Sequence, residues 1–249
     1  MLRNFEERGV SPDAIRIILW DIDGTLMTST VGGAYKEYLA PVLEEIFGTS
    51  GKLAEMSVSG MTDTQIAYEA VKDDGISVSE VFERLPQFSA ALEKGMLDFI
   101  NQRSDRYRKF AGSSEILTET EKTPKFINAL LTGNLEVAAK IKLNYVDLWR
   151  FFDKVPHSFG EISHERQKLA FEAGRIYRDF LSAEIKPHQF IIVGDTPNDI
   201  ACARAFGANI ISVATGRNHP PEELQKHSPD FLLENLENTS ELYKILNSF

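Results

Sequence analysis

The sequence predicts an α/β protein with a doubly wound parallel sheet and an all-helical segment inserted after the first strand. Two apolar runs without polar alternation, at residues 17–20 and 190–193, are typical of buried parallel strands. From residue 126 onward such runs alternate with helical patterns, which favours right-handed strand–helix–strand crossovers. Residues 30–107 show helical patterns and no strong strand run. We therefore predict a core formed by residues 1–29 and 108–249, and an insertion of residues 30–107.

Composition describes an ordinary soluble globular protein. Of its 249 residues 43% are hydrophobic and 26% are charged, and the net charge is −10. This acidic balance, with a pI near 5.1, argues against a nucleic-acid or anionic-membrane partner. Cys202 is the only cysteine, the first ten residues are charged, and no apolar run approaches membrane-spanning length. We expect a cytoplasmic protein.

The first strand follows a short extension and ends in acidic residues. Residues 1–14 form the extension, with Ser11-Pro12-Asp13 at the entry to the strand. After the strand come Asp21 and Asp23, and then Gly24, which permits a sharp turn. Residues 27–33, rich in Thr, Ser and Gly, favour a flexible connection into the insertion.

The insertion is predicted to contain four helices. Their limits follow from apolar spacing, from capping residues such as Thr62, and from the helix stops Gly48 and Gly75. We place them at about residues 34–47 and 64–72, from residue 77 or 79, and from 86 to about 108. The chain returns to the core near Phe110-Ala111-Gly112, so both connections carry small residues.

The rest of the core alternates strands with helices. The predicted strands are 126–131, 155–159, 190–193, 209–213 and 231–233. The predicted helices run from 134 to about 143 and over 163–181, 198–206 and 239–246. In such open sheets the ligand site lies beyond the carboxyl ends of the strands, where Asp21, Thr132 and Asp195 all stand.

Asp21 and Asp23 suggest phosphate chemistry. One carboxylate can attack phosphorus and a second can protonate the leaving oxygen. Two carboxylates this close repel each other unless a cation such as Mg²⁺ holds them. The alternative is a surface strand that ends in an acidic Asp-Gly turn.

Two later strand ends carry candidates for the same site. Thr132-Gly133-Asn134 could hold a phosphate oxygen at a helix start, or could simply form a capped turn. In Gly194-Asp195-Thr196-Pro197-Asn198-Asp199, two further acids could complete an oxygen shell for Mg²⁺. Asp199 could instead favour the dipole of the following helix.

These residues, in this order, resemble the motifs of the haloacid dehalogenase (HAD) superfamily. The segment from Asp21 to Leu26 is similar to the first motif, Asp-x-Asp-Gly-Thr-Leu. Thr132 is similar to the second motif, and the segment from Gly194 to Asp199 is similar to the fourth. The insertion resembles a C1 helical cap of the phosphoglycolate-phosphatase-like branch. The sequences of residues 131–136, 142–143 and 151–153 also resemble that branch.

The resemblance implies a role for each motif residue. Asp21 would be nucleophile and Mg²⁺ ligand, and Asp23 the acid/base whose backbone carbonyl also binds the metal. Asp195 and Asp199 would complete the Mg²⁺ site. The phosphate would be bound by Gly24, Thr25, Thr132, Gly133 and Asn134. For the third-motif cation, Arg166 fits a variant with Phe159-Gly160 upstream, and Lys168 is the competitor.

We expect a Mg²⁺-dependent phosphatase that acts on a small phosphorylated metabolite, and the resemblance points to phosphoglycolate as the substrate. Asp23 separates this chain from the dehalogenases of the superfamily, which lack that acid. A sugar phosphomutase is one alternative, although the loop from Ser59 to Asp63 carries no base to grip a second phosphate. A non-enzymatic receiver-like phospho-acceptor is the other, but receivers lack so large a helical insertion. The expected partner is a small-molecule phosphoester, and no oligomeric state is predicted.

Overall fold

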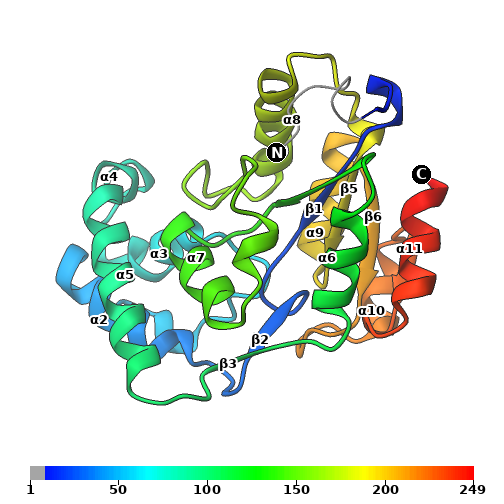
Figure 1. The fold of residues 1–249 in the computed structure, drawn as a ribbon. Helices are drawn as coiled ribbons and strands as arrows, with labels where there is room; N and C mark the ends of the chain where they lie inside the picture. Colours follow the sequence, from blue (N-terminus) through cyan, green and yellow to red (C-terminus); the bar gives the residue numbers. More distant parts are fainter. Residues whose placement is uncertain (1–8) are drawn as a thin grey trace.

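A computed structural model describes residues 9–249 of the chain (Figure 1). Among these residues five parallel strands form one sheet, in the order β4-β1-β5-β6-β7. Their bounds are β1 Arg16–Trp20, β4 Phe126–Leu130, β5 Phe190–Gly194, β6 Asn209–Val213 and β7 Phe231–Leu233. The central position of β1 between β4 and β5 brings the ends of these three strands together. The predicted doubly wound α/β class is confirmed.

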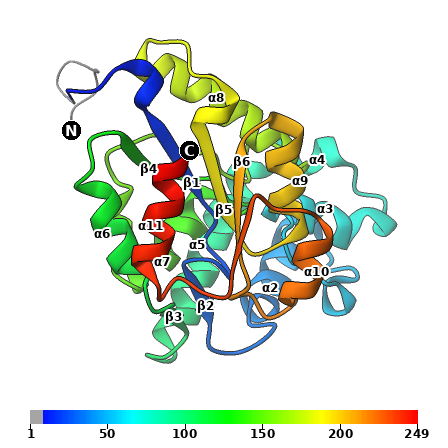
Figure 2. The ribbon, with the colours of Figure 1, turned by 90° about the vertical axis from the view of Figure 1, so that its right-hand side faces the viewer.

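Both faces of the sheet are buried, which explains the continuous apolar runs. Ile17 and Leu19 pack with one group of core residues, whereas Ile18 and Trp20 pack with the other. The first face is covered by α8, α9 and α10, and the second by α6, α11 and α7 (Figure 2). These helices are α6 Ser113–Glu121, α7 Glu136–Tyr145, α8 Gln167–Leu181, α9 Pro197–Phe206, α10 Pro221–Lys226 and α11 Thr239–Ser248.

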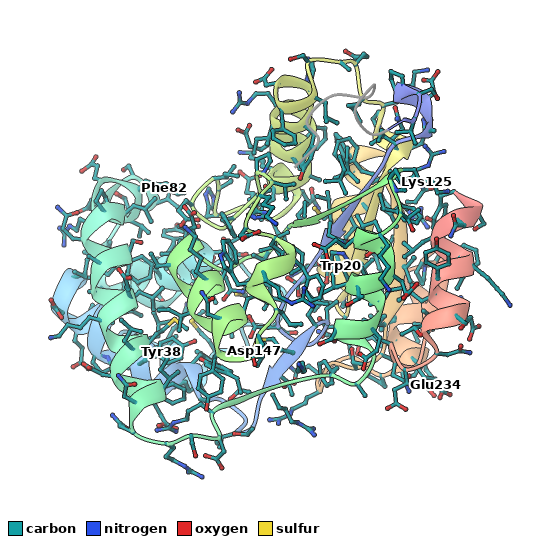
Figure 3. The ribbon with its side chains drawn as sticks, viewed as in Figure 1. Trp20, Tyr38, Phe82, Lys125, Asp147 and Glu234 are labelled. Carbon is teal, nitrogen blue, oxygen red and sulfur yellow. The ribbon has the colours of Figure 1, made fainter. Side chains whose placement is uncertain are left out.

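The segment between β2 (Met27–Ser29) and β3 (Tyr107–Lys109) is helical throughout its regular parts, and the structure describes all of it. It contains α2 Tyr35–Phe47, α3 Asp63–Val71, α4 Val78–Glu83 and α5 Leu85–Asn101. In the described part of the chain the 3₁₀ helices are Pro12–Ala14, Leu53–Glu55, Lys72–Asp74, Trp149–Phe151 and Pro187–Gln189. We call residues 30–107 the helical insertion. It lies beside the sheet, with the labelled Tyr38 inside it and Trp20 in the core (Figure 3).

The two connections of the insertion are more regular than predicted. Instead of a flexible segment, Met27–Ser29 forms an antiparallel pair with Tyr107–Lys109. The last helix of the insertion ends at Asn101 and does not reach Arg108. Arg106 explains this end, because its buried guanidinium turns back to donate to the Phe99 carbonyl at 3.0 Å.

Three further differences concern the second half of the chain. The strand predicted at 155–159 is reduced to one bridge, between Leu131 and Ser158. Ser158 forms backbone hydrogen bonds with Leu130, the last residue of β4, and with Thr132 just beyond it. The helix predicted from residue 163 begins at Gln167, after a turn that holds Arg166. Helices α6 and α10 were not predicted. None of the described helices has the length and apolarity needed to cross a membrane.

Candidate active site

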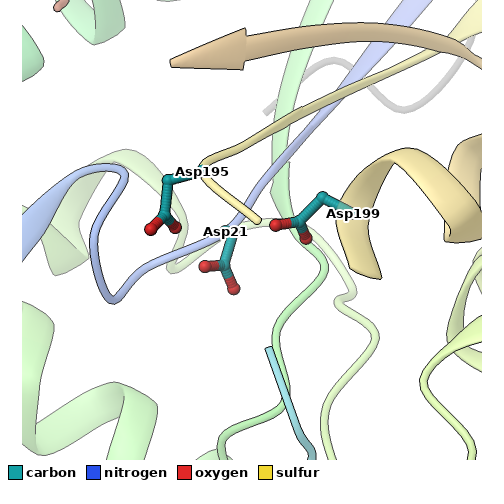
Figure 4. A group of neighbouring side chains, drawn as sticks. All are labelled: Asp21, Asp195 and Asp199. Atoms are coloured by element: carbon teal, nitrogen blue, oxygen red, sulfur yellow. The ribbon is translucent and has the colours of Figure 1, made fainter. Parts of the chain in front are cut away.

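Three predicted acids meet at the carboxyl edge of the sheet (Figure 4). Asp21 follows β1, Asp195 follows β5, and Asp199 stands in the first turn of α9. Each offers a carboxylate oxygen, and these oxygens all lie within 4.8 Å of one another. All three residues are buried. The adjacency of β1 and β5 in the sheet therefore brings together acids that are far apart in the sequence.

Glycine is required where the backbone approaches these acids. Gly24 has φ +88°, and a Cβ there would lie 2.2 Å from Asp195 Oδ2. A Cβ on Gly216 would lie even closer to the same oxygen. The turn that Gly24 permits also places Thr25, whose hydroxyl donates to Asp195 Oδ1 at 3.2 Å. Gly24 and Thr25 thus shape the pocket around Asp195.

Arg166 is the cation that reaches the acids. Its Nη2 donates to Asp21 Oδ1 at 2.9 Å and to Asp199 Oδ1 at 2.6 Å, and its side chain is only 6% exposed. Its Nε is buried without a hydrogen-bond partner among the described residues, so it can still donate to an anion. Lys168 instead pairs with Glu165 on the surface of α8. Of the two candidates, the structure brings only Arg166 to the acids.

The three acids differ in how far the protein satisfies them. Asp199 Oδ2 accepts from the amide and the hydroxyl of Thr196, and its Oδ1 accepts from Arg166. Among residues 9–249, the Asp195 carboxylate accepts a hydrogen bond only from Thr25. Burial, opposed by Arg166 and reinforced by Asp199, raises the pKa of Asp21 to about 6. Burial and the Asp21 carboxylate raise the pKa of Asp195 well above its usual range. The cluster is therefore short of positive charge.

A hard divalent cation fits this shortage. Asp21 and Asp195 offer carboxylate oxygens in one buried space, and such oxygens are the ligands that Mg²⁺ prefers. Asp23 follows Asp21 by two residues, so its backbone carbonyl is an oxygen donor on the same turn. The donor set contains neither sulfur nor imidazole among the described residues. Its chemistry suits Mg²⁺ better than a softer metal.

The loop after β4 forms the other side of the site. This loop follows β4, which pairs with β1 on the side opposite β5, and it contains Thr132, Gly133 and Asn134. Asn134 Nδ2 donates to Thr132 Oγ1 and to Asp23 Oδ2, both at 2.8 Å. This loop is thereby joined to the first acidic turn.

Two residues of this side were not assigned a role from the sequence. Lys142, on α7, is 6% exposed, and its Nζ lies 2.6 Å from Asp23 Oδ2. The sequence carried a signal for it, since Lys142 falls on the buried face of α7 with Ala138 and Ala139. Glu161, after the predicted strand that does not form, accepts from the Glu136 amide at the start of α7.

The helical insertion contacts the site through the loop before α3. The Asp63 amide donates to the Gly133 carbonyl at 2.7 Å, and Asp63 Oδ2 accepts from the Leu135 amide at 2.8 Å. Gly133 allows this approach, because a Cβ there would lie 2.1 Å from the Met61 carbonyl. Burial, offset in part by Lys142, raises the pKa of Asp63 to about 6. Between insertion and core lies a cavity of about 470 Å³, lined by both acidic turns, Arg166 and Lys142.

Comparison with known proteins identifies a family over part of the chain and a fold over nearly all of it. Residues 168–239 match the model of a family described as HAD-hydrolase-like. No curated protein sequence matches the chain.

Solved structures match most of the chain. One similar structure is a predicted phosphatase from Clostridium acetobutylicum, with a TM-score of 0.61, 16% identity, and coverage of 94% of this chain and 99% of that one. A second is a predicted phosphoglycolate phosphatase from Haemophilus somnus, with a TM-score of 0.59, 18% identity, and coverage of 92% of this chain and 98% of that one. A third is a candidate β-phosphoglucomutase from Thermotoga maritima, with a TM-score of 0.58, 17% identity, and coverage of 93% of this chain and 100% of that one. The family model over residues 168–239 confirms the predicted resemblance to the HAD superfamily for that part of the chain, and the solved structures confirm the predicted fold.

Proposed function

We propose that this HAD-like chain is a Mg²⁺-dependent phosphatase that hydrolyses a small phosphorylated metabolite through an aspartyl-phosphate on Asp21. The observation that carries the proposal is the pairing of Asp21 with Arg166 at 2.9 Å, beside Asp195 and with Asp23 two residues away. A nucleophile, an acid/base, a cation for the phosphate and oxygen ligands for a metal are then present in one cavity.

The reaction takes two balanced steps. In the first, an Asp21 oxygen bonds to phosphorus, the bond from phosphorus to the leaving oxygen breaks, and Asp23 donates a proton to that oxygen. In the second, Asp23 takes a proton from a water molecule that attacks phosphorus, the bond to Asp21 breaks, and inorganic phosphate forms. Asp23 thus ends as it began, and its 45% exposed side chain can reach both the leaving group and water.

Each remaining residue has a task in this scheme. Arg166 neutralises the phosphate and orients Asp21, while Asp199 holds Arg166 in place. Asp21, Asp195 and the Asp23 carbonyl would hold Mg²⁺, and Asp199 would support that site from α9. The metal supplies positive charge that offsets the clustered carboxylates and the phosphate. Gly24, Thr25, Thr132, Gly133 and Asn134 would line the phosphate position.

The cavity supports a small substrate. Its volume of about 470 Å³ is in the range of small-molecule sites and includes the space that the phosphate itself needs. The Asp63 loop closes it against Gly133, which would restrict access for a phosphorylated protein. A phosphoglycolate-like metabolite, in the cytoplasm, is our specific proposal.

A phosphomutase is the second candidate, because one similar structure is a candidate β-phosphoglucomutase. The Asp63 loop carries no base, as the sequence predicted, but Lys36 and Arg217 also line the cavity. A mutase would interconvert phosphate isomers in the presence of a bisphosphate primer, whereas a phosphatase releases phosphate. A receiver-like acceptor would release at most one phosphate per chain.

The test is phosphate release from p-nitrophenyl phosphate with and without Mg²⁺. We expect many turnovers with Mg²⁺, arrest by EDTA, and recovery on addition of excess Mg²⁺. A panel of phosphometabolites, ranked by kcat/KM, would then identify the substrate. Full activity in metal-free buffer would contradict the metal requirement, and no turnover on any phosphoester would contradict the phosphatase.

A further inference from the structure

A second buried cation, Lys142, has no task in the scheme above. It is a core residue on α7, and only 6% of it is exposed. Its Nζ lies 2.6 Å from Asp23 Oδ2 and 2.5 Å from Asn134 Oδ1. Long charged side chains are rarely buried this far unless they are paired. Here the partner is the residue that we assign to proton transfer.

The contacts of Asp23 are unequal at its two oxygens. Oδ2 accepts from Lys142 Nζ at 2.6 Å and from Asn134 Nδ2 at 2.8 Å. Within residues 9–249 no hydrogen bond to Oδ1 is formed, and the Asp23 side chain is 45% exposed in the cavity. One oxygen is therefore held by the protein, and the other is left to face a ligand.

The holding group is itself fixed. The amide of Asn134 donates to Asp23 and to Thr132 Oγ1, while its oxygen accepts from Lys142. Lys142, Asn134 and Asp23 thus form a closed triangle of hydrogen bonds, tied through Thr132 to the end of β4. Reversing the Asn134 amide would set Lys142 against an NH₂ group, so its orientation follows from the network.

Lys142 faces only oxygen acceptors here, the carboxylate of Asp23 at 2.6 Å and the side-chain oxygen of Asn134 at 2.5 Å, as expected of an ammonium donor. A charged donor at 2.6 Å makes a stronger and more directional hydrogen bond than a neutral one. The interaction can therefore hold the Asp23 carboxyl in one rotamer.

We propose that Lys142 is a positioning residue which, with Asn134, holds Oδ2 of Asp23 and so makes Oδ1 the oxygen that exchanges the proton. This inference rests on the proposed phosphatase function and deepens it. Two donors already point at Oδ2, so a proton there would meet other hydrogens, whereas Oδ1 has room for one. In the first step the proton on Oδ1 passes to the leaving oxygen. In the second, Oδ1 receives a proton from the attacking water.

The test compares leaving groups that differ in their need for a proton. Nitrophenolate is stable as an anion and can leave without one, whereas the alkoxide of an alkyl phosphate needs protonation. In Lys142→Met the Asp23 carboxyl is no longer held by the ammonium. We expect kcat/KM, which reports the steps up to departure of the leaving group, to fall on the order of 10²-fold on an alkyl phosphate, in the range of lost general acid catalysis. On p-nitrophenyl phosphate we expect kcat/KM to fall less than about threefold, since its leaving group needs no proton; the second step, common to both substrates, affects only kcat.

Matched variants separate positioning from folding. Lys140 is on the same helix and forms an exposed ion pair with Glu136, so Lys140→Met should leave both activities unchanged. Lys142→Arg keeps a charged donor and should recover part of the alkyl phosphate activity. If Lys142→Met does not fold, as judged by its thermal transition, Lys142→Gln takes its place, because it removes the charge from the same position and keeps a polar side chain. That variant should show the same dependence on leaving group.

The outcomes are distinct. A loss confined to alkyl phosphates supports the inference. An equal loss on both substrates in a folded variant would overturn it, because Lys142 would then bind the phosphate or only support the fold. No loss on either substrate would overturn it as well. The wild-type protein tests the phosphatase separately, since turnover of p-nitrophenyl phosphate does not depend on what Lys142 does.

Discussion

The site has two halves, and in each a buried cation offsets the negative charge of nearby carboxylates, but the halves differ in how exposed those carboxylates are. The strand-end half consists of Asp21, Asp195, Asp199 and Arg166, and every member comes from the core. The boundary half consists of Asp23, Asn134, Lys142 and Asp63, and Asp63 comes from the helical insertion. Each half sets a buried cation against carboxylates. In the strand-end half the paired acids are at most 7% exposed, whereas the Asp23 side chain is 45% exposed.

The difference separates what must be rigid from what must admit substrate. Arg166 links Asp21 and Asp199 through one guanidinium, so the strand-end half is complete without the insertion. The boundary half is closed by Asp63, through which the insertion bonds to the loop after β4. We infer that changes in the strand-end half affect every substrate alike, and that changes at the boundary affect substrates selectively.

The largest effect is expected in the strand-end half, from Asp21→Asn. The amide cannot attack phosphorus, so kcat should fall by a factor on the order of 10⁴ or more on every substrate. The far-UV spectrum should not change, because the substitution keeps the shape of the side chain. Steady-state rates with Mg²⁺ on two substrates measure this. Activity near that of the wild type would refute the nucleophile.

Arg166→Met should come next and should also affect stability. Removing the cation leaves Asp21 and Asp199 buried without their partner, which costs about 3–5 kcal/mol in the free energy of unfolding. Turnover should fall on all leaving groups by roughly the same factor, in contrast to Lys142→Met. Lys168→Met is the matched control, since Lys168 pairs only with Glu165 on the surface. If Lys168→Met were the more damaging change, our assignment of the cation would be wrong.

Gly133→Ala probes the boundary half at the docking loop. The added Cβ would lie 2.1 Å from the Met61 carbonyl, so the loop before α3 has to move. We expect kcat/KM to fall about tenfold on the best metabolite, with a smaller change on p-nitrophenyl phosphate, because the loss of binding contacts appears mainly in KM. Gly32→Ala is the control, since its Cβ meets only Arg217 Nη1 at 3.4 Å. Equal losses on both substrates would show that the substitution acts at the phosphate position, which both substrates share, and not through the docking loop.

The smallest effect concerns stability against pH. Burial raises the pKa of Glu161, beside the boundary half, from 4.5 to about 7, and its Oε2 is buried without a partner among the described residues. The folded state therefore binds more protons than the unfolded state between these values, so stability falls as pH rises from about 4.5 to 7. Glu161→Gln should reduce this slope, to which the raised pKa values of Asp21 and Asp63 also contribute, and should stabilise the protein at pH 8 by about 1 to 3 kcal/mol. Denaturant unfolding at several pH values measures it, and an unchanged slope would contradict it.

The sequence was sufficient to bring together the acids of the strand-end half because they follow a local rule. Asp21 and Asp195 each end an apolar run, and the ends of parallel strands share one edge of the sheet. Periodicity also placed most helices within a few residues. It could not choose between Arg166 and Lys168, because both lie near the start of one helix. The choice depends on the turn before Gln167, which tertiary contacts fix.

The boundary half could not be predicted in the same way. The contact between Lys142 and Asp23 joins residues 119 positions apart, and only the packing of α7 against the sheet reveals it. The β2–β3 pair was missed for a similar reason, since three-residue strands give no periodic signal. The last helix of the insertion was extended too far, to about residue 108, because the hydrogen bond of Arg106 to the Phe99 carbonyl, beyond the end of the helix, gives no periodic signal.

The β2–β3 pair also bears on how long the insertion needs to be. Ser29 pairs with Tyr107, so the whole intervening segment is a loop whose ends are tied at one place. The chain entropy lost in closing such a loop grows only logarithmically, by about 0.6 kcal/mol for each doubling of its length. Length is therefore a weakly constrained variable in this chain. The stronger constraint is the packing of α5 on α7, because any replacement segment must cover the same apolar residues.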